Sequence, residues 1–462
     1  MTRPLEPSAP LHDISLAEAT AVWTRIAAQS FGGPAGQIAV MHRILVDEKR
    51  WISEERFLHA LNYCMLLPGP EAQQLAIYTG WLMHGTRGGL IAGSLFVLPG
   101  FLAILLLSVV YARYQETMVV QALFFGLKAA VLMIVLEAVQ RIGRRTLKHP
   151  LLWGMAGGAF AALFFFGVPF PLVILAAGLI GYVGSQVRPG LFAGSGGHGP
   201  SAPGDAAAPA LITAETAPHV TPSWERALRV LGTGLAVWFA PLLLLGAQLG
   251  FSSVYWQQAK FFSQMAVVTF GGAYAVLAYI AQQAVETFGW LQPGEMLNGL
   301  GMAETTPGPL IQVVQYVGFL GAYRAPEGLS PLAAGLLASV IATWATYVPC
   351  FLWIFLGAPY IERLRGNQAL SGALTAITAA VVGVILNLSL WFALHTLFGH
   401  LQERQFGLVQ LDLPVWRTLS LPTLVLSVVA GLALFRFKIG TLPTLALSTA
   451  LGMGYVFLSR SL

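Results

Sequence analysis

Charged side chains are scarce in this sequence. They make up 10% of its 462 residues, whereas soluble domains carry about 25%. Hydrophobic residues make up 56%, and the mean hydropathy is +0.70. A chain this apolar cannot cover its surface with charge in water, but lipid can solvate it. The composition therefore excludes most soluble enzymes, nucleic-acid binders and disordered scaffolds, and it predicts an all-α polytopic membrane protein.

Cysteine is almost absent, and histidine is scattered. Cys64 and Cys350 are too few for a four-ligand metal site or a disulfide framework. The nine histidines form no His-x-x-x-His or Glu-x-x-His pair. No flavin or nicotinamide motif occurs either. The sequence thus predicts no metal, no cofactor and no enzyme, and the net charge of +5 is attributed to cytoplasmic loops rather than to nucleic-acid binding.

The apolar segments form two series with a polar stretch between them. Residues 1–187 hold the first series, and 251–462 hold the second. Residues 188–223 are rich in Gly, Ala and Pro, a composition typical of a flexible linker, here placed in the cytoplasm. One isolated apolar stretch follows within 224–250 and is long enough to be an extra transmembrane helix.

The two series are copies of one another. Three landmarks recur at one constant offset of 239 residues: Phe31-Gly32-Gly33 as Phe270-Gly271-Gly272, Trp51 as Trp290, and Pro68-Gly69-Pro70 as Pro307-Gly308-Pro309. Further along, Leu98-Pro99 matches Val348-Pro349 after a longer loop. We infer an internal duplication that covers most of the chain.

Each half contains eight apolar helical pieces. The first four are about 15 residues long and reach only about 22 Å, less than the ~30 Å hydrocarbon core. The last four are long enough to cross. In the first half the predicted pieces are 16–30, 33–47, 53–67 and 70–84, followed by 88–113, 118–140, 150–167 and 170–187.

Loop charges predict that the two halves have opposite orientations. Basic residues crowd 41–50 and 141–148 in the first half, but 280–289, the counterpart of 41–50, has none. The last turn of the second half instead carries Arg436 and Lys438. Because basic loops stay in the cytoplasm, the halves are predicted to be inverted-topology repeats, as in secondary transporters. The extra helix supplies the odd crossing.

The short pieces are broken in pairs at Phe-Gly-Gly and Pro-Gly-Pro. We favour re-entrant hairpins, two from each side of the membrane, with their breaks meeting near the midplane. The alternative is a set of ordinary tilted passes that are kinked at Gly and Pro.

The breaks predict an anion site. A broken helix exposes backbone N–H groups and a partial positive charge at its N-terminus, and lipid cannot satisfy these groups. Such N-termini follow Gly32-Gly33, Gly271-Gly272, Pro70 and Pro309. The Pro-Gly-Pro breaks, Pro68-Gly69-Pro70 and Pro307-Gly308-Pro309, would gate or complete the site. The alternative is that these motifs only permit close packing and kinks.

Polar side chains near the breaks are further candidates. Arg25 lies in an otherwise apolar run and is predicted to clamp a tetrahedral anion, or else to snorkel to the interface. Ser30 and Thr269 precede the two Phe-Gly-Gly motifs and offer hydroxyl groups. Gln264 is the counterpart of Arg25 in the second half, so the predicted site is asymmetric in charge. Amide groups are expected to bind the anion or a neighbouring helix; the candidates are Gln37, Asn62, Gln73, Gln74, Gln312 and Gln315.

Acids near the breaks are candidates for a coupling proton. Glu71 follows the first Pro-Gly-Pro directly, and Glu304 lies three residues before the second. Lys128 and Glu137 lie nine residues apart on one long helix. They are interpreted as a structural charge pair or as charges that face water.

This pattern resembles the long, two-domain members of the chromate transporter family. The resemblance rests on Phe31-Gly32-Gly33-Pro34-Ala35-Gly36-Gln37-Ile38-Ala39, Trp51 and Leu67-Pro68-Gly69-Pro70, and on Phe270-Gly271-Gly272, Trp290 and Thr306-Pro307-Gly308-Pro309. Many members have His where this chain has Gln37. The resemblance implies chromate export from the bacterial cytoplasm across the inner membrane, driven by the proton-motive force, with chromate resistance as the result.

Other functions stay open. The chain could transport sulfate or another anion, or it could be a passive anion channel. A membrane-embedded enzyme acting on lipid would need a polar catalytic cluster at the interface, and the charged stretch 47–55 has no catalytic spacing. The sequence also leaves open whether the protein is a homodimer.

Overall fold

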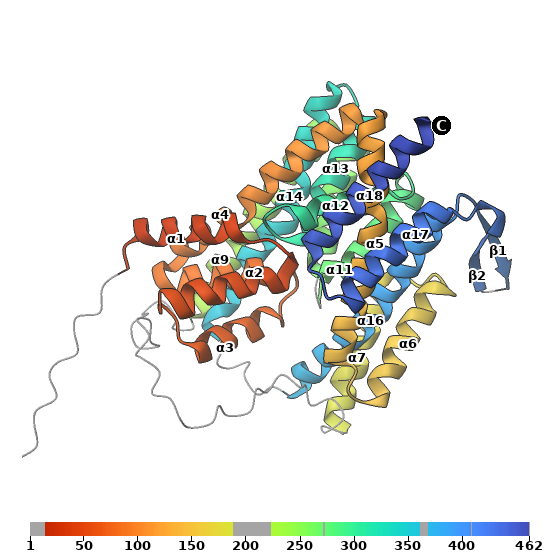
Figure 1. The fold of residues 1–462 in the computed structure, drawn as a ribbon. Coiled ribbons are helices and arrows are strands. Elements are labelled where there is room, and N and C mark those ends of the chain that lie inside the picture. The colour runs from red at the N-terminus through yellow and green to blue at the C-terminus, as the bar shows by residue number, and fades with distance from the viewer. Residues whose placement is uncertain (1–13, 188–222, 271–272, 361–367, 408, 462) are drawn as a thin grey trace, which may run out of the picture.

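The structure is a computed structural model, and it describes residues 14–187, 223–270, 273–360, 368–407 and 409–461. Helices account for nearly all of its regular structure (Figure 1). The all-α polytopic fold class predicted from composition is therefore confirmed.

The first half contains the eight predicted helical pieces. Its helices are α1 (Leu16–Gln29), α2 (Gly33–His42), α3 (Glu54–Cys64), α4 (Glu71–Tyr114), α5 (Met118–Thr146), α6 (Pro150–Phe164) and α7 (Phe170–Val187). A π-helical turn, η1 (Arg43–Glu48), continues α2. Two predicted pieces lie within α4. Its two arms meet at a kink, where His84 and Gly85 leave helical geometry.

The second half repeats this order. After α9 (Trp224–Leu249) come α10 (Val254–Val268), α11 (Ala273–Gln282), α12 (Glu295–Thr305), α13 (Val313–Arg324), α14 (Pro331–Gly357), α16 (Gln368–Leu397), α17 (Leu421–Gly431) and α18 (Thr441–Ser461). Short turns extend this set: η4 (Gln283–Thr287), η5 (Leu310–Gln312), η6 (Ala358–Tyr360), η7 (Trp416–Thr418) and η8 (Leu432–Arg436). Pro99 in α4 and Pro349 in α14 occupy matching positions inside their helices.

One element was not expected from the sequence. Strands β1 (Leu401–Phe406) and β2 (Val409–Pro414) form an antiparallel hairpin, in which Arg404 pairs with Leu411. The hairpin projects from the helical body between α16 and α17 (Figure 1).

Seven of the described helices are long and apolar enough to cross a membrane: α4, α5, α7, α9, α14 with η6, α16 and α18. Helices α1, α2 and α3 are shorter and group together at one side of the helical body (Figure 1). Helix α5 of the first half packs against α12, α16, α17 and α18 of the second half, and α14 packs against α4. The largest apolar core accordingly draws residues from both halves, and a second core packs residues between 19 and 96 against 350–358.

Candidate functional site

The broken helices of the two repeats meet through reciprocal hydrogen bonds. The Gly69 N–H donates to the carbonyl of Thr269 at 2.7 Å, and the Gly308 N–H donates to the carbonyl of Ser30 at 2.9 Å. Each Pro-Gly-Pro therefore holds the residue before the other repeat's Phe-Gly-Gly. Residues that exchange partners in this way are related by a twofold axis. The duplication seen in the sequence is thus a pseudo-twofold in space.

A second reciprocal contact surrounds the same glycines. Gly308 lies against the backbone of Gly100 in α4, and a Cβ atom on Gly308 would be 3.0 Å from the Gly100 Cα. In the other repeat, a Cβ on Gly69 would be 3.0 Å from the Cys350 Sγ in α14. Both glycines have positive φ angles, +100° for Gly308 and +125° for Gly69. The close approach and the left-handed backbone both require glycine at these two positions.

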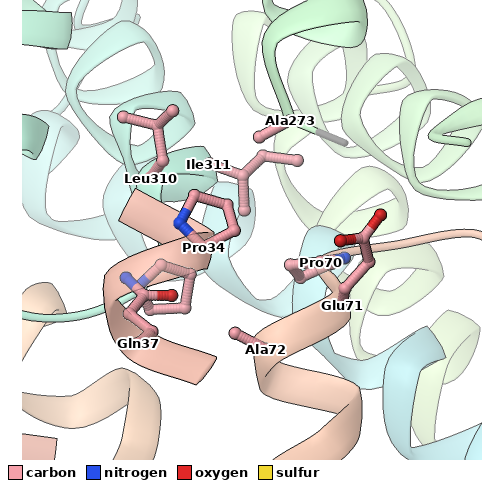
Figure 2. Close-up of a pocket in the computed structure, with 9 residues that line it drawn as sticks. Pro34, Gln37, Pro70, Glu71, Ala72, Ala273, Leu310 and Ile311 are labelled. Atoms are coloured by element: carbon pink, nitrogen blue, oxygen red, sulfur yellow. The ribbon is translucent and has the colours of Figure 1, made fainter. Parts of the chain in front are cut away.

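Four helix N-termini surround one small cavity (Figure 2). Its lining comes from the start of α2, the start of α4, the start of α11 and η5; the residues are Pro34, Gln37, Pro70, Glu71, Ala72, Ala273, Pro309, Leu310 and Ile311. The predicted convergence of the breaks is present in the structure. The cavity volume is about 10 Å³, which is room for about one water molecule. The cavity therefore has no room for a solute larger than water in this structure.

Three N-termini at the cavity, those of α2, α4 and η5, lack side-chain caps. Helices α5 and α12 lack them too, but several other helices have them. Ser side chains cap α1, α3, α9, α10 and α14 by accepting a backbone N–H; these caps are Ser15, Ser53, Ser223, Ser253 and Ser330. The residues before α2, α4 and η5 are Gly32, Pro70 and Pro309, and none of them makes such a bond. First-turn N–H groups have no intrahelical partner, so the cavity offers donors and positive helix ends to an anion.

Buried amide side chains hold the breaks in place. Gln37 Nε2 donates to the carbonyl of Gly308, and Gln74 Nε2 donates to that of Pro68 at 2.7 Å. Gln73 bonds the carbonyl of Gly93 at 3.0 Å. Gln312 donates to Gln315, which in turn donates to the carbonyl of Phe101; neither of them lines the cavity. Of these glutamines only Gln37 reaches the cavity, and its Oε1 has no hydrogen-bond partner among the described residues.

The hydroxyls of Ser30 and Thr269 are committed to their own helices. Ser30 Oγ donates to the carbonyl of Ile26 at 2.7 Å, and Thr269 Oγ1 donates to that of Met265 at 2.5 Å. Neither hydroxyl proton is free for an anion in this conformation. The sequence could not reveal this, because a hydroxyl next to a helix end can bond either way.

Three predicted side chains lie away from the cavity. Arg25 is 46% exposed and forms an ion pair with Glu48 at 2.8 Å. Gln264, its counterpart in the second repeat, and Asn62 on α3 are exposed. The structure therefore places Arg25 at the edge of the protein beside the basic 41–50 stretch, which fits the snorkelling alternative better than the clamp. Gly271 and Gly272 lie outside the described residues.

Substituting Arg25 is accordingly expected to have a small effect. An exposed ion pair contributes about 0–1 kcal/mol, so Arg25→Ala should lower the rate of anion transport by less than about threefold. Glu48→Gln removes the carboxylate of the same ion pair and should lower the transport rate by a similarly small factor. Transport rates in membrane vesicles, normalised to inserted protein, measure both. A loss of transport rate above tenfold in Arg25→Ala, but not in Glu48→Gln, would show that Arg25 binds the anion directly.

The two candidate acids differ in their surroundings. Glu71 lines the cavity at the first position of α4, and it is the one titratable side chain among the described residues that do so. Glu304 is buried near the C-terminal end of α12, where the Tyr274 hydroxyl donates to its Oε1. Only Glu71 is in a position to meet an anion.

Sequence reasoning missed part of the lining. Ala72, Ala273, Leu310 and Ile311 contribute to it, and they carry no chemical signal of their own. Their positions could have identified them as lining residues, because each lies within three residues after a Phe-Gly-Gly or Pro-Gly-Pro break.

Comparison with known proteins agrees with this geometry. A model of the family described as chromate transporter matches residues 17–182 and 256–454. The chain belongs to the chromate transporter family. The match falls once on each repeat, so the family unit is present twice.

Two relatives align with more than three quarters of the chain. A chromate transport protein of Pseudomonas aeruginosa is 31% identical over 360 residues, 77% of this chain and 76% of that protein. A chromate transport protein of Cupriavidus metallidurans is 29% identical over 366 residues, 78% of each chain. No solved structure matches the chain. The relatives are named as transport proteins, which agrees with a multi-pass membrane transporter rather than an enzyme.

Proposed function

We propose that this protein is a secondary active transporter that exports chromate from the bacterial cytoplasm across the inner membrane and thereby confers chromate resistance. The observation that carries the proposal is the convergence of uncapped helix N-termini from both repeats on one cavity. Backbone amides and helix ends bind oxyanions in many proteins. The names of the Pseudomonas and Cupriavidus relatives supply the substrate.

In this proposal the oxyanion binds to backbone N–H groups at the breaks. The donors would come from Gly32, Gly33 and the first turn of α4, and from Gly271, Gly272 and η5. Gln37 would orient the anion, because its amide already bridges the two repeats at Gly308. A potential that is negative inside favours anion exit by about 2.3 kcal/mol per charge per 100 mV.

Alternating access would open the cavity to one side at a time. The cavity is too small for a tetrahedral oxyanion in this conformation, so the Pro-Gly-Pro breaks would have to separate to admit it.

Sulfate is the second candidate substrate. Backbone amides recognise the charge and shape of a tetrahedral dianion, not its central atom. Nothing in the described lining of the cavity distinguishes chromate from sulfate.

Everted membrane vesicles provide the test, because they convert export into uptake. Vesicles that contain the protein should accumulate radiolabelled chromate when respiration energises them, and a protonophore should abolish the accumulation. Vesicles without the protein are the control. Accumulation of sulfate but not of chromate would keep the transport function and identify sulfate as the substrate. Uptake that follows the membrane potential but does not respond to the pH difference would indicate a passive channel and would contradict the proposal.

A further inference from the structure

A second cavity lies in the part of the protein that the proposed transport function leaves unused. Its volume is about 280 Å³, ample for a hydrated tetrahedral anion. The walls come from α5, the turn before α12, the end of α16 and the start of α17; the lining residues are Phe125, Lys128, Pro293, Gly294, His395, Thr396, Phe398, Gly399, Thr418, Ser420 and Thr423. Both repeats therefore contribute to it.

Lys128 brings an ammonium group to this cavity without a directly paired carboxylate. The sequence suggested a charge pair with Glu137, but Glu137 pairs with Arg141 at 3.4 Å instead. Among the residues that the structure describes, Lys128 forms no ion pair or hydrogen bond. Its Nζ lies against the turn at Gly294, where a Cβ atom would be 3.4 Å away. A partly buried ammonium group without a partner is unfavourable, so an anion beside it would stabilise the protein.

The nearest acid cannot serve as that anion. Glu295 follows Gly294, but both of its carboxylate oxygens bond Arg324 at 2.7 Å. The Tyr111 hydroxyl donates to the same carboxylate at 2.9 Å, and the Gln292 N–H donates to it at 2.7 Å. All its usual acceptor positions are thus filled. Glu295 is close enough to attract Lys128, but one carboxylate faces two cations, Arg324 and Lys128, so the group as a whole keeps one positive charge in excess.

Hydroxyl groups face the same cavity. Thr396 Oγ1 is buried and has no hydrogen-bond partner among the described residues. It comes from the end of α16, whereas Lys128 comes from α5. A buried hydroxyl without a partner carries a desolvation cost of about 1–3 kcal/mol, which a bound oxyanion would remove. An oxyanion in this cavity would therefore supply both missing interactions: a negative charge beside Lys128 and a hydrogen-bond acceptor for Thr396 Oγ1.

The cavity lies at one end of the transport path. Helix α12 begins beside Gly294 and ends at Thr305, just before the second Pro-Gly-Pro. At 1.5 Å per residue, this short helix separates the two cavities by about 15 Å. Lys128 lies ten residues after the start of α5, in its first half, whereas the basic residues Arg144 and Arg145 lie at its end. Because those basic residues mark the cytoplasmic side, the cavity belongs to the outer side.

We propose that this outer cavity is a second oxyanion site, in which Lys128 and Thr396 bind the anion after it leaves the central breaks. The inference rests on the proposed function for the identity of the anion. An outer site shortens the step between the central site and water, and it makes release depend on the anion concentration outside.

Equilibrium dialysis of the purified full-length protein with radiolabelled chromate and sulfate tests the site. The wild type is expected to bind up to two tetrahedral anions per chain. Lys128→Gln should lose one of them or weaken it at least tenfold, and Thr396→Val should weaken the same one. Lys128→Arg, which keeps the charge, should retain it. Lys148→Gln removes an exposed lysine near the other end of α5 and should leave both sites intact. Thermal unfolding of each variant monitors the fold.

The outcomes separate this inference from the proposed function. If the wild type transports chromate and Lys128→Gln binds as the wild type does, the outer site is wrong and the function stands. If vesicles containing the wild type accumulate no chromate but Lys128→Gln still loses one bound anion, the function is wrong and the site stands. If binding and transport are both absent, both are wrong.

Discussion

Replacing Gly308 with alanine is expected to abolish transport and to reduce the amount of folded protein in the membrane. The φ angle of +100° costs a residue with a Cβ about 1–3 kcal/mol. The new methyl group would also meet the backbone of Gly100 at 3.0–3.3 Å, and overpacking of this kind costs about 1–3 kcal/mol more. The same backbone shift would break the hydrogen bonds from Gly308 to Ser30 and from Gln37 to Gly308. Size-exclusion profiles and thermal unfolding in detergent measure the loss.

Gly69→Ala is the matched control, because it changes the equivalent glycine of the other repeat. The backbone cost is similar, but the methyl group would meet the side-chain atoms Gln74 Nε2 at 2.9 Å and Cys350 Sγ at 3.0 Å. Side chains can move, so this variant should be less unstable than Gly308→Ala by about 1–2 kcal/mol. Adding Cys350→Ala should recover part of its stability. Equal stability of the two single variants would show that the contact with Gly100 does not matter.

Replacing Glu71 with glutamine is expected to separate anion transport from proton movement. A dianion about 4 Å from an ionised carboxylate would be repelled by about 8 kcal/mol at an effective dielectric constant of 20. Glu71 must therefore be neutral when the central cavity holds chromate, and a proton would accompany each anion outward. In energised everted vesicles, the acidic lumen would then slow uptake while the potential drives it. Nigericin, which collapses the pH difference in potassium medium and leaves the potential, should raise the wild-type rate.

Glutamine has the shape of the protonated acid, so Glu71→Gln should bind chromate within about threefold of the wild type and should not respond to nigericin. Glu304→Gln is the control, because Glu304 lies outside the cavity lining and its bond with Tyr274 can be kept by the amide oxygen. It should retain the nigericin response. A response that survives in Glu71→Gln and disappears in Glu304→Gln would transfer the coupling role to Glu304.

The positions of the breaks were predictable because glycine and proline act locally. Helix α2 begins at Gly33, and α4 begins after Pro70, as the motifs indicated. The meeting of the breaks was also predictable, since a duplicated motif of opposite orientation has to be related by a twofold. The hairpin at 401–414 was missed because its strands are polar and short, although the alternation of Leu411 and Leu413 with polar neighbours was a usable signal.

Side-chain partners were not predictable, because they come from distant parts of the chain. Arg25 looked like an intramembrane charge until the fold placed Glu48 beside it. Lys128 looked paired because Glu137 was near in sequence, yet the residues that decide its surroundings, Gly294 and Thr396, lie more than 160 positions away. Neighbouring residues in the sequence therefore predict where the helices break, but they do not predict which charges neutralise one another.

The reciprocal bonds of the two Pro-Gly-Pro breaks also bear on what a single repeat can form. One repeat alone would leave its Gly69 N–H and Ser30 carbonyl without these partners, because each bond is completed by the other repeat. A protein built from a single repeat would therefore have to pair with a second copy to form the same arrangement of breaks.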